Sequence, residues 1–229
     1  MRAILVGLLF IGSLGAVPAT GADEPIDKKE LVVAANRLKQ IAIAFHVSHD
    51  VSQRLPGDIR DKEGKPLLSW RVAILPYIEE EKLYKQFKLD EPWDSANNKP
   101  LIEKMPKLYA PIRVKAKEGE TFYQTFTGEG TMFLPKKPAL KIFEITDGAS
   151  NTGLVFEAGT PVVWTKPEDM VFDEKKALPK LGGMFDGICN VAMCDGSVRR
   201  LKTGADEKEL KKLIMPADGN PIDFTKLDK

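Results

Sequence analysis

The residues best suited to chemistry in this sequence are two histidines and an aspartate that lie close together. His46 and His49 are the only histidines in the chain, and Asp50 follows directly. Helical residues three apart lie on neighbouring turns of one face, so the two imidazoles are expected to be near each other. Two such ligands can begin a zinc site, but no Cys, His or acidic residue at a recognised spacing provides the third. We expect ordinary polar contacts at a helix end, with a hydrolase that uses these three residues as an alternative.

A second group of candidate ligands lies in turns that contain glycine. It consists of Asp147, Asn151, Asp186 and Asp195. Carboxylate and amide oxygens are the ligands that calcium prefers, so a calcium site is one alternative for these four residues. Their spacing is not that of an EF-hand loop, and turn conformation alone explains Asp and Asn beside Gly. We therefore favour simple turns and expect no cofactor.

Aromatic residues form the third group. Trp70, Trp93 and Trp164, together with Tyr77, can line a ligand surface. Buried tryptophans, however, more commonly serve as large anchors of a hydrophobic core. We favour the core interpretation and keep a small-ligand surface as the alternative.

A single arginine stands inside an apolar run. Arg71 lies within residues 70–75, and a buried guanidinium needs a polar or charged partner. Asp94 and Glu157 are the candidate partners, and we expect a structural ion pair rather than an anion site. If the protein binds a ligand, the sequence favours a contact region that consists of Trp70, Arg71, Trp93, Asp94 and Trp164.

Sequence motifs of catalysis are missing. The chain contains no Gly-x-Ser-x-Gly elbow, no Ser-x-x-Lys, no His-Glu-x-x-His and no phosphate-binding loop. We therefore predict a protein that is not an enzyme.

The first residues of the chain predict export. Residues 1–22 have a positive start at Arg2, an apolar run and small residues at the end, the pattern of a signal peptide. The run is shorter than a membrane span and is interrupted by Gly and Pro, so we expect no stable span after cleavage. We expect residues 23–229 to form one domain in the periplasm or at the cell surface.

The charge balance excludes one class of partner. Removing Arg2 with the signal peptide leaves 33 basic residues (34 minus 1) against 33 acidic ones. A net charge of zero argues against nucleic acid. The expected partner is an unknown protein or small ligand.

The elements that must position these residues are helical first and extended afterwards. Apolar residues at three- and four-residue intervals over residues 31–49 predict a long amphipathic helix. Ser69 is a suitable cap for a helical insertion that extends to Lys104, with Asp94 or Ser95 capping its last helix. Strands are expected over residues 121–126, 153–157 and 162–164.

The end of the chain gives the clearest local signal. Two strand-like runs, residues 190–194 and 197–201, flank Asp195-Gly196, a dipeptide that suits a tight hairpin. A short helix over residues 206–214 follows. The fold class is therefore α+β, in which a long N-terminal helix packs on an antiparallel β-sheet with a helical insertion, a C-terminal β-hairpin and a short helix. Cys189 and Cys194 lie an odd number of residues apart in an extended segment, so they face opposite sides and should not form a disulfide.

Five segments in order resemble a known family, the paralogous proteins of domain of unknown function 1559, associated with planctomycetes and also classed as solute-binding family 10. These segments are residues 38–50, 68–77, 92–95, 147–152 and 195–199. The resemblance implies a pilin- or pseudopilin-like fold, and such relatives can hold calcium in C-terminal loops. The chain departs from it in two places: it has an ordinary signal peptide, and it has Phe185 where relatives often have histidine.

Together these observations predict an exported, non-catalytic module that is structural or binds a protein or ligand. A small-ligand or calcium-binding protein and a hydrolase are the alternatives.

Overall fold

The computed structural model describes residues 26–229, and the predicted signal peptide at residues 1–22 lies outside them. The α-helices are α1 (Lys28–Ser52), α2 (Trp70–Ala73), α3 (Glu81–Tyr84) and α4 (Glu207–Ile214). The 3-10 helices are η1 (Leu75–Ile78), η2 (Lys99–Lys104), η3 (Ile142–Glu144), η4 (Ala149–Asn151) and η5 (Phe224–Lys226). The strands are β1 (Ile59–Arg60), β2 (Pro66–Leu68), β3 (Glu120–Gln124), β4 (Phe126–Thr127), β5 (Gly153–Val163), β6 (Met170–Val171), β7 (Ile188–Met193) and β8 (Val198–Lys202).

The long helix α1 confirms the amphipathic pattern. Asp27 caps its start, because the Asp27 carboxylate accepts a hydrogen bond from the amide of Lys29 at 2.9 Å. Gln53 ends it in the left-handed conformation, with φ at 58°. One face of the helix is fully buried and supplies Ala34, Leu38, Ile41, Ala42, Ala44 and Phe45 to the core.

The central sheet has the strand order β3-β5-β7-β8, and all of its neighbouring strands are antiparallel. The α+β prediction is therefore confirmed. The β7–β8 hairpin turns at Asp195-Gly196 as predicted: Gly196 has φ at 83°, and its amide donates to the carbonyl of Met193 at 3.0 Å. The two strands predicted over residues 153–157 and 162–164 form one strand, because a register irregularity opposite β3 accommodates Pro161 within β5.

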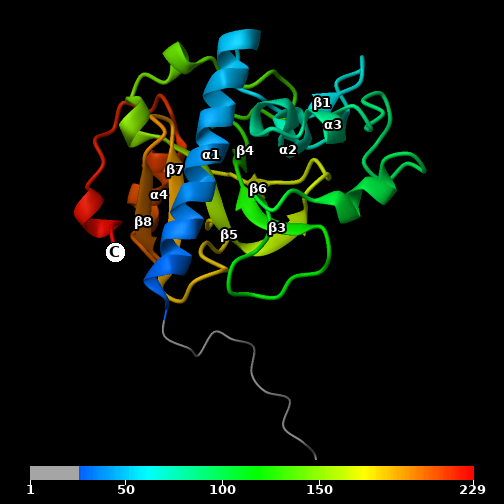
Figure 1. Cartoon of the computed structure of the whole chain (residues 1–229). Helices are drawn as coiled ribbons and strands as arrows, with labels where there is room; N and C mark the ends of the chain where they lie inside the picture. Colours follow the sequence, from blue (N-terminus) through cyan, green and yellow to red (C-terminus); the bar gives the residue numbers. More distant parts are fainter. Residues whose placement is uncertain (1–25) are drawn as a thin grey trace, which may run out of the picture.

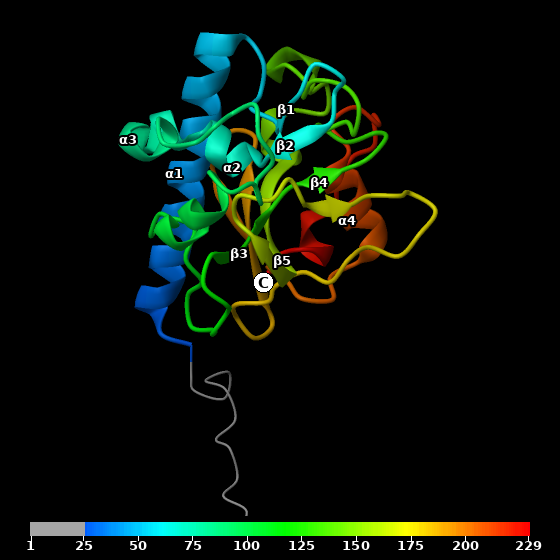
Figure 2. The same cartoon turned by 90° about the vertical axis from the view of Figure 1, so that its right-hand side faces the viewer.

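Three layers enclose two hydrophobic clusters. Figure 1 shows α1 crossing the sheet in front of β5 and β7, and Figure 2 shows α4 on the opposite side of the sheet. Cys189 belongs to the cluster beneath α4, whereas Cys194 belongs to the cluster beneath α1. Their places in different clusters confirm that the two cysteines face opposite sides of the sheet. Both thiols are free and buried.

The insertion is helical but more broken than predicted. Ser69 caps α2 as expected, since its hydroxyl accepts from the amide of Arg71 at 3.2 Å. The last helix, η2, starts at Lys99, so neither Asp94 nor Ser95 is its N-cap. Instead, the Asn98 side chain ties the preceding loop together by donating to three backbone carbonyls, those of Lys88, Glu91 and Pro92.

The described residues also contain a small, separate two-stranded sheet. Strands β4 and β6 pair in parallel, Phe126 opposite Met170, and the amide of Met170 donates to the carbonyl of Thr125 at 3.1 Å. This pairing places Asp169, the residue before β6, beside Thr125.

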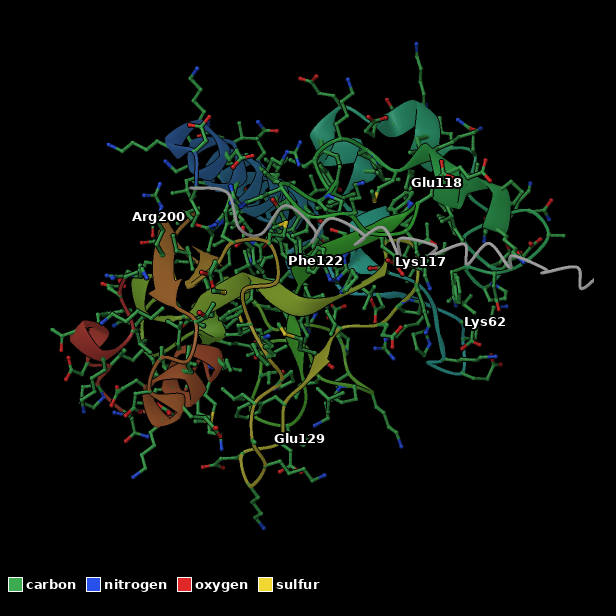
Figure 3. All side chains as sticks on the ribbon, turned by 90° about the horizontal axis from the view of Figure 1, so that it is seen from below. Lys62, Lys117, Glu118, Phe122, Glu129 and Arg200 are labelled. Atoms are coloured by element: carbon green, nitrogen blue, oxygen red, sulfur yellow. The ribbon has the colours of Figure 1, made fainter. Side chains whose placement is uncertain are left out.

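The surface carries charges of both signs. Figure 3 shows charged side chains around the whole periphery, with Lys62 and Arg200 on opposite sides of the molecule. Among residues 26–229, none of the helices has the length and apolar character needed to cross a bilayer.

Candidate functional site

Arg71 is fully buried, and Asp169 is its partner. The Arg71 Nη2 atom lies 2.8 Å from Asp169 Oδ1, and the two side chains are 0% and 2% exposed. The same guanidinium donates to the carbonyl of Tyr123 from Nε at 2.9 Å and from Nη2 at 2.7 Å, and Nη1 donates to Ser69 Oγ at 2.7 Å. The expected structural ion pair is present, with a different acid from those proposed.

Both partners named from the sequence are wrong for identifiable reasons. Asp94 is exposed at the surface. Glu157 is buried at the centre of β5, where its carboxylate accepts hydrogen bonds from the amide and the side chain of Asn190, each at 2.9 Å. Burial raises the pKa of Glu157 to about 7, and the Asn190 hydrogen bonds oppose this rise.

Asp169 is held by donors from two other segments. Its carboxylate accepts from Trp70 Nε1 at 3.2 Å and from the backbone amide of Thr125 at 2.8 Å. Burial raises the pKa of Asp169, and the Arg71 guanidinium acts in the opposite direction. The two Asp169 oxygens share the indole N–H of Trp70, which lies 3.2 Å from each of them.

A second acid, Asp58, lies beside this cluster. Its Oδ1 accepts a hydrogen bond from the backbone amide of Trp70 at 3.1 Å, whereas its Oδ2 lies 3.8 Å from Arg60 Nη2, beyond hydrogen-bond distance. Burial, and then the charge of Asp169, raise the pKa of Asp58 to about 6. Asp58 therefore changes charge near neutral pH.

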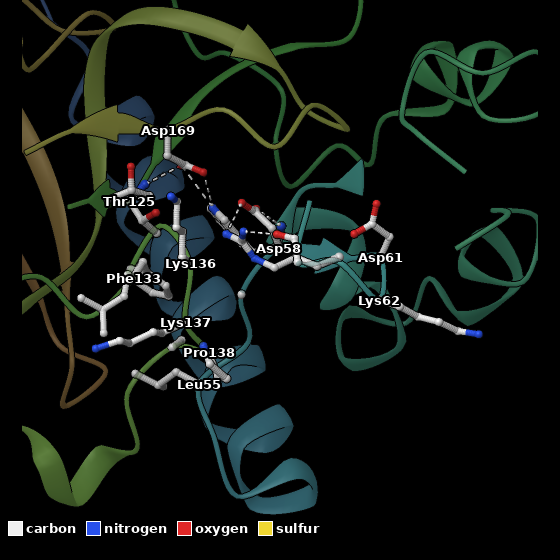
Figure 4. Close-up of a pocket in the computed structure, with 17 residues that line it drawn as sticks. Leu55, Asp58, Asp61, Lys62, Thr125, Phe133, Lys136, Lys137, Pro138 and Asp169 are labelled. Atoms are coloured by element: carbon white, nitrogen blue, oxygen red, sulfur yellow. Dashed lines mark hydrogen bonds and ion pairs between the residues drawn. The ribbon is translucent and has the colours of Figure 1, made fainter. Parts of the chain in front are cut away.

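Asp58, Trp70, Thr125 and Asp169 open into one cavity of about 380 Å³, which we call the Asp58 pocket. Figure 4 shows Asp58 and Asp169 at its floor. Apolar side chains line one wall: Leu55, Phe133, Leu134, Pro138 and Ala139. Charged residues of the β1–β2 hairpin and of the loop after β4 line the rest: Arg60, Asp61, Lys62, Lys136 and Lys137.

Thr125 carries an unsatisfied polar atom in this pocket. Its side chain is fully buried, and its hydroxyl has no hydrogen-bond partner within the described residues. Buried polar atoms in folded proteins are nearly always paired, so an unpaired one in a pocket indicates a missing partner. The sequence offered no signal for this residue, because it lies in an ordinary run of β-forming residues.

Only part of the contact region predicted from the sequence is assembled. Trp70 lines the Asp58 pocket, and Arg71 lies directly beneath it. Trp164 is instead buried in the core, where it stacks on Tyr109 at 5.9 Å. Trp93 is half-buried beneath Lys166, and neither Trp93, Asp94 nor Trp164 lines the pocket.

The four oxygen ligands considered for calcium occupy turns. Asp147 accepts from the amides of Asp218 and Gly219, Asn151 donates to the carbonyl of Asp147, and Asp195 accepts from the amide of Ser197. Asp186 is exposed. No group of three or more His, Cys, Asp or Glu residues between residues 26 and 229 is arranged to hold a metal ion.

The histidines lie at the end of α1 and away from the pocket. His49 Nε2 accepts a hydrogen bond from the amide of Ile142 at 3.3 Å, and its Nδ1 lies 3.8 Å from Asp50. His46 is half-buried. Neither histidine lines the Asp58 pocket, so these three residues share no site with its carboxylates.

Comparison with known proteins gives one finding. No curated protein and no solved structure matches the chain. A family model does match, from α1 through the turn after β4, and this segment includes Asp58, Trp70, Arg71 and Thr125 but not Asp169. Residues 34–129 are similar to the family described as a protein of unknown function (DUF1559), in support of the resemblance noted in the sequence.

Proposed function

We propose that this protein is an exported, non-catalytic module that binds a small polar ligand in the Asp58 pocket. One observation carries the proposal: a pocket of about 380 Å³ is lined by Thr125, whose hydroxyl is unpaired, and by Asp58, one oxygen of which has no hydrogen-bond donor. Ligand pockets commonly measure about 300–1,000 Å³ and combine apolar walls with a few convergent polar groups. The Asp58 pocket has both properties.

Binding fits the two acids better than catalysis does. Asp169 is fixed by hydrogen bonds from Arg71, Trp70 and Thr125. Asp58 keeps an oxygen that accepts no hydrogen bond. General acid and base steps usually divide their work between two groups that reach the substrate, and Asp58 is the acid of this pair with an oxygen left for a ligand.

The proposed location rests on residues 1–22, whose composition is that of a signal peptide. We infer that the mature protein resides in the periplasm or at the cell surface. The long helix on an antiparallel sheet supports the pilin-like kinship that the resemblance implies, and the family resemblance supports a planctomycete origin.

The indole N–H signals of the three tryptophans test the proposal. Trp70 Nε1 donates to Asp169 at the pocket floor, whereas Trp164 Nε1 donates to the carbonyl of Ile102 in the core. In a ¹⁵N–¹H spectrum, the small-molecule fraction of the host envelope should shift the Trp70 signal and leave the Trp164 signal in place. Trp→Phe variants assign the signals.

Two variants separate the pocket from the surface. Asp58→Asn keeps an acceptor for the Trp70 amide but alters the free oxygen, so it should weaken the Trp70 response. Asp94→Asn, at an exposed position outside the pocket, should leave it unchanged. A fraction that shifts Trp93 alone, or no tryptophan signal at any concentration, would count against the pocket.

A further inference from the structure

The floor of the Asp58 pocket contains two acids and two arginines. Asp58 and Asp169 lie close to Arg71, which is fully buried, and Arg60 lines the pocket beside Asp58. Arg71 donates to Asp169, Tyr123 and Ser69 and forms no hydrogen bond with Asp58. Asp58 Oδ2 therefore receives no hydrogen bond from Arg71.

Arg60 is an ion-pair partner of Asp58 but donates no hydrogen bond to it. Arg60 Nη2 lies 3.8 Å from Asp58 Oδ2, and Arg60 Nη1 donates to the carbonyl of Gly64 within its own hairpin. The Thr125 hydroxyl, in the lining of the same pocket, also lacks a partner. A group with several N–H donors can satisfy both oxygens at once.

The rim has the opposite charge. Lys136 and Lys137, in the loop after β4, line the pocket and are exposed. Neither forms an ion pair or side-chain hydrogen bond with another described residue. Figure 4 shows Lys136 extending toward Thr125 and Asp169. An anionic group bound here would meet two uncommitted ammonium groups.

We infer that the Asp58 pocket takes a small ligand with an ammonium group at one end and a carboxylate at the other, the chemistry of an ω-amino acid. The ammonium group binds Asp58 Oδ2 and the Thr125 hydroxyl, and the carboxylate binds Lys136 and Lys137. This inference rests on the proposed function and specifies its ligand class.

Two other ligand classes fit less well. Calcium prefers about six to eight oxygen ligands, and Asp169 Oδ1 already accepts hydrogen bonds from Trp70, Arg71 and Thr125. A simple anion satisfies the lysines but leaves Asp58 and Thr125 without donors. A ligand with both charged ends offers a partner to Asp58, to Thr125 and to the two lysines.

The inference carries a pH dependence. The ammonium group binds ionised Asp58, whose pKa of about 6 reflects burial and the charge of Asp169, opposed by Arg71 and Arg60. Ionisation grows as the pH rises through this value, so affinity should rise between pH 5 and pH 8. At one pH unit below the pKa, roughly one tenth of the carboxyl is ionised.

Three probes of equal chain length test the inference in the wild-type protein. δ-Aminovalerate carries both charged ends, valerate lacks the ammonium group and pentylamine lacks the carboxylate. The Trp70 indole signal reports binding of each at pH 8. Since one charge-assisted hydrogen bond contributes about 1.5–3 kcal/mol, δ-aminovalerate should bind roughly tenfold or more tightly than either matched probe.

Variants assign each end of the probe. Asp58→Asn should reduce δ-aminovalerate binding to the level of valerate, and the double variant Lys136→Gln/Lys137→Gln should reduce it to the level of pentylamine. Asp94→Asn and Lys107→Gln, both exposed and outside the pocket, are the matched controls and should change nothing. The three probes are compared in the wild-type protein, so the inference can still be tested if a variant fails to fold.

The outcomes separate this inference from the proposed function. If valerate or pentylamine binds as tightly as δ-aminovalerate, the two-ended ligand is refuted while the pocket remains a binding site. If no probe moves the Trp70 signal but envelope fractions do, the ligand class is again refuted. If neither probes nor fractions move it, the inference and the proposed function both fail.

Discussion

The buried pair of Arg71 and Asp169 gives the strongest prediction about stability. In the variant Asp169→Asn, Arg71 remains 0% exposed but keeps only the neutral acceptors Tyr123 and Ser69. Removing one partner of a buried ion pair costs about 3–5 kcal/mol, because the remaining charge is uncompensated. The amide nitrogen of Asn would also face the donors of Trp70 or Thr125. We therefore expect a loss of about 4 kcal/mol in the free energy of unfolding.

Urea unfolding, followed by circular dichroism, measures this loss. With an m-value of about 2 kcal/mol per molar urea, the midpoint should fall by roughly 2 M. The chain contains a matched control: Arg199 and Asp228 also lie 2.8 Å apart, but their side chains are 34% and 42% exposed. Asp228→Asn should cost about 0–1 kcal/mol, as exposed pairs do. Equal losses in the two variants would refute the reasoning, since the Arg71–Asp169 pair is buried and has further donors on its carboxylate, whereas the control pair is exposed.

Three further predictions concern other parts of the fold. In the wild type, the free energy of unfolding should fall by up to about 3 kcal/mol as the pH rises from 4.5 to 7, because the folded-state pKa of Glu157, about 7, exceeds the unfolded value of 4.5. Glu157→Gln should abolish this fall. Urea titrations of both proteins at pH 4.5 and 8 check this, and parallel pH profiles would contradict it. Cys189 and Cys194 should react with a thiol reagent only after unfolding, because both are buried and burial raises the pKa of Cys189. Gly182→Ala should destabilise more than Gly204→Ala in thermal melts: both have positive φ, but a Cβ at Gly182 would lie 2.7 Å from a backbone oxygen whereas one at Gly204 meets nothing.

Local signals explain which elements the sequence could reveal. The apolar face of α1, the Asp195-Gly196 turn and the cap of α4 at Asp206 each depend on residues within a few positions of one another. Such patterns are visible in a single sequence because the physics that produces them is local.

The pocket depends on distant residues, so it could not be predicted in the same way. Trp70 and Arg71 were recognised as special, but their partner Asp169 lies in a polar loop next to Lys166 and Glu168. Nothing local distinguishes Asp169 from Asp94 as a partner for Arg71. The parallel pairing of β4 with β6 decides between them, and two-residue strands leave no readable periodicity.

The pairing of Arg71 with Asp169 also bears on the order of folding. The two residues are 98 positions apart in the sequence. Bringing such distant points of a flexible chain together costs about 4 kcal/mol in loop-closure entropy, similar to the loss expected above when one partner is removed. The pairing of β5 with β3 joins Val163 to Glu120 and so shortens the open loop that the ion pair must close. The Asp58 pocket, which Asp169 lines, therefore depends on the central sheet for its assembly.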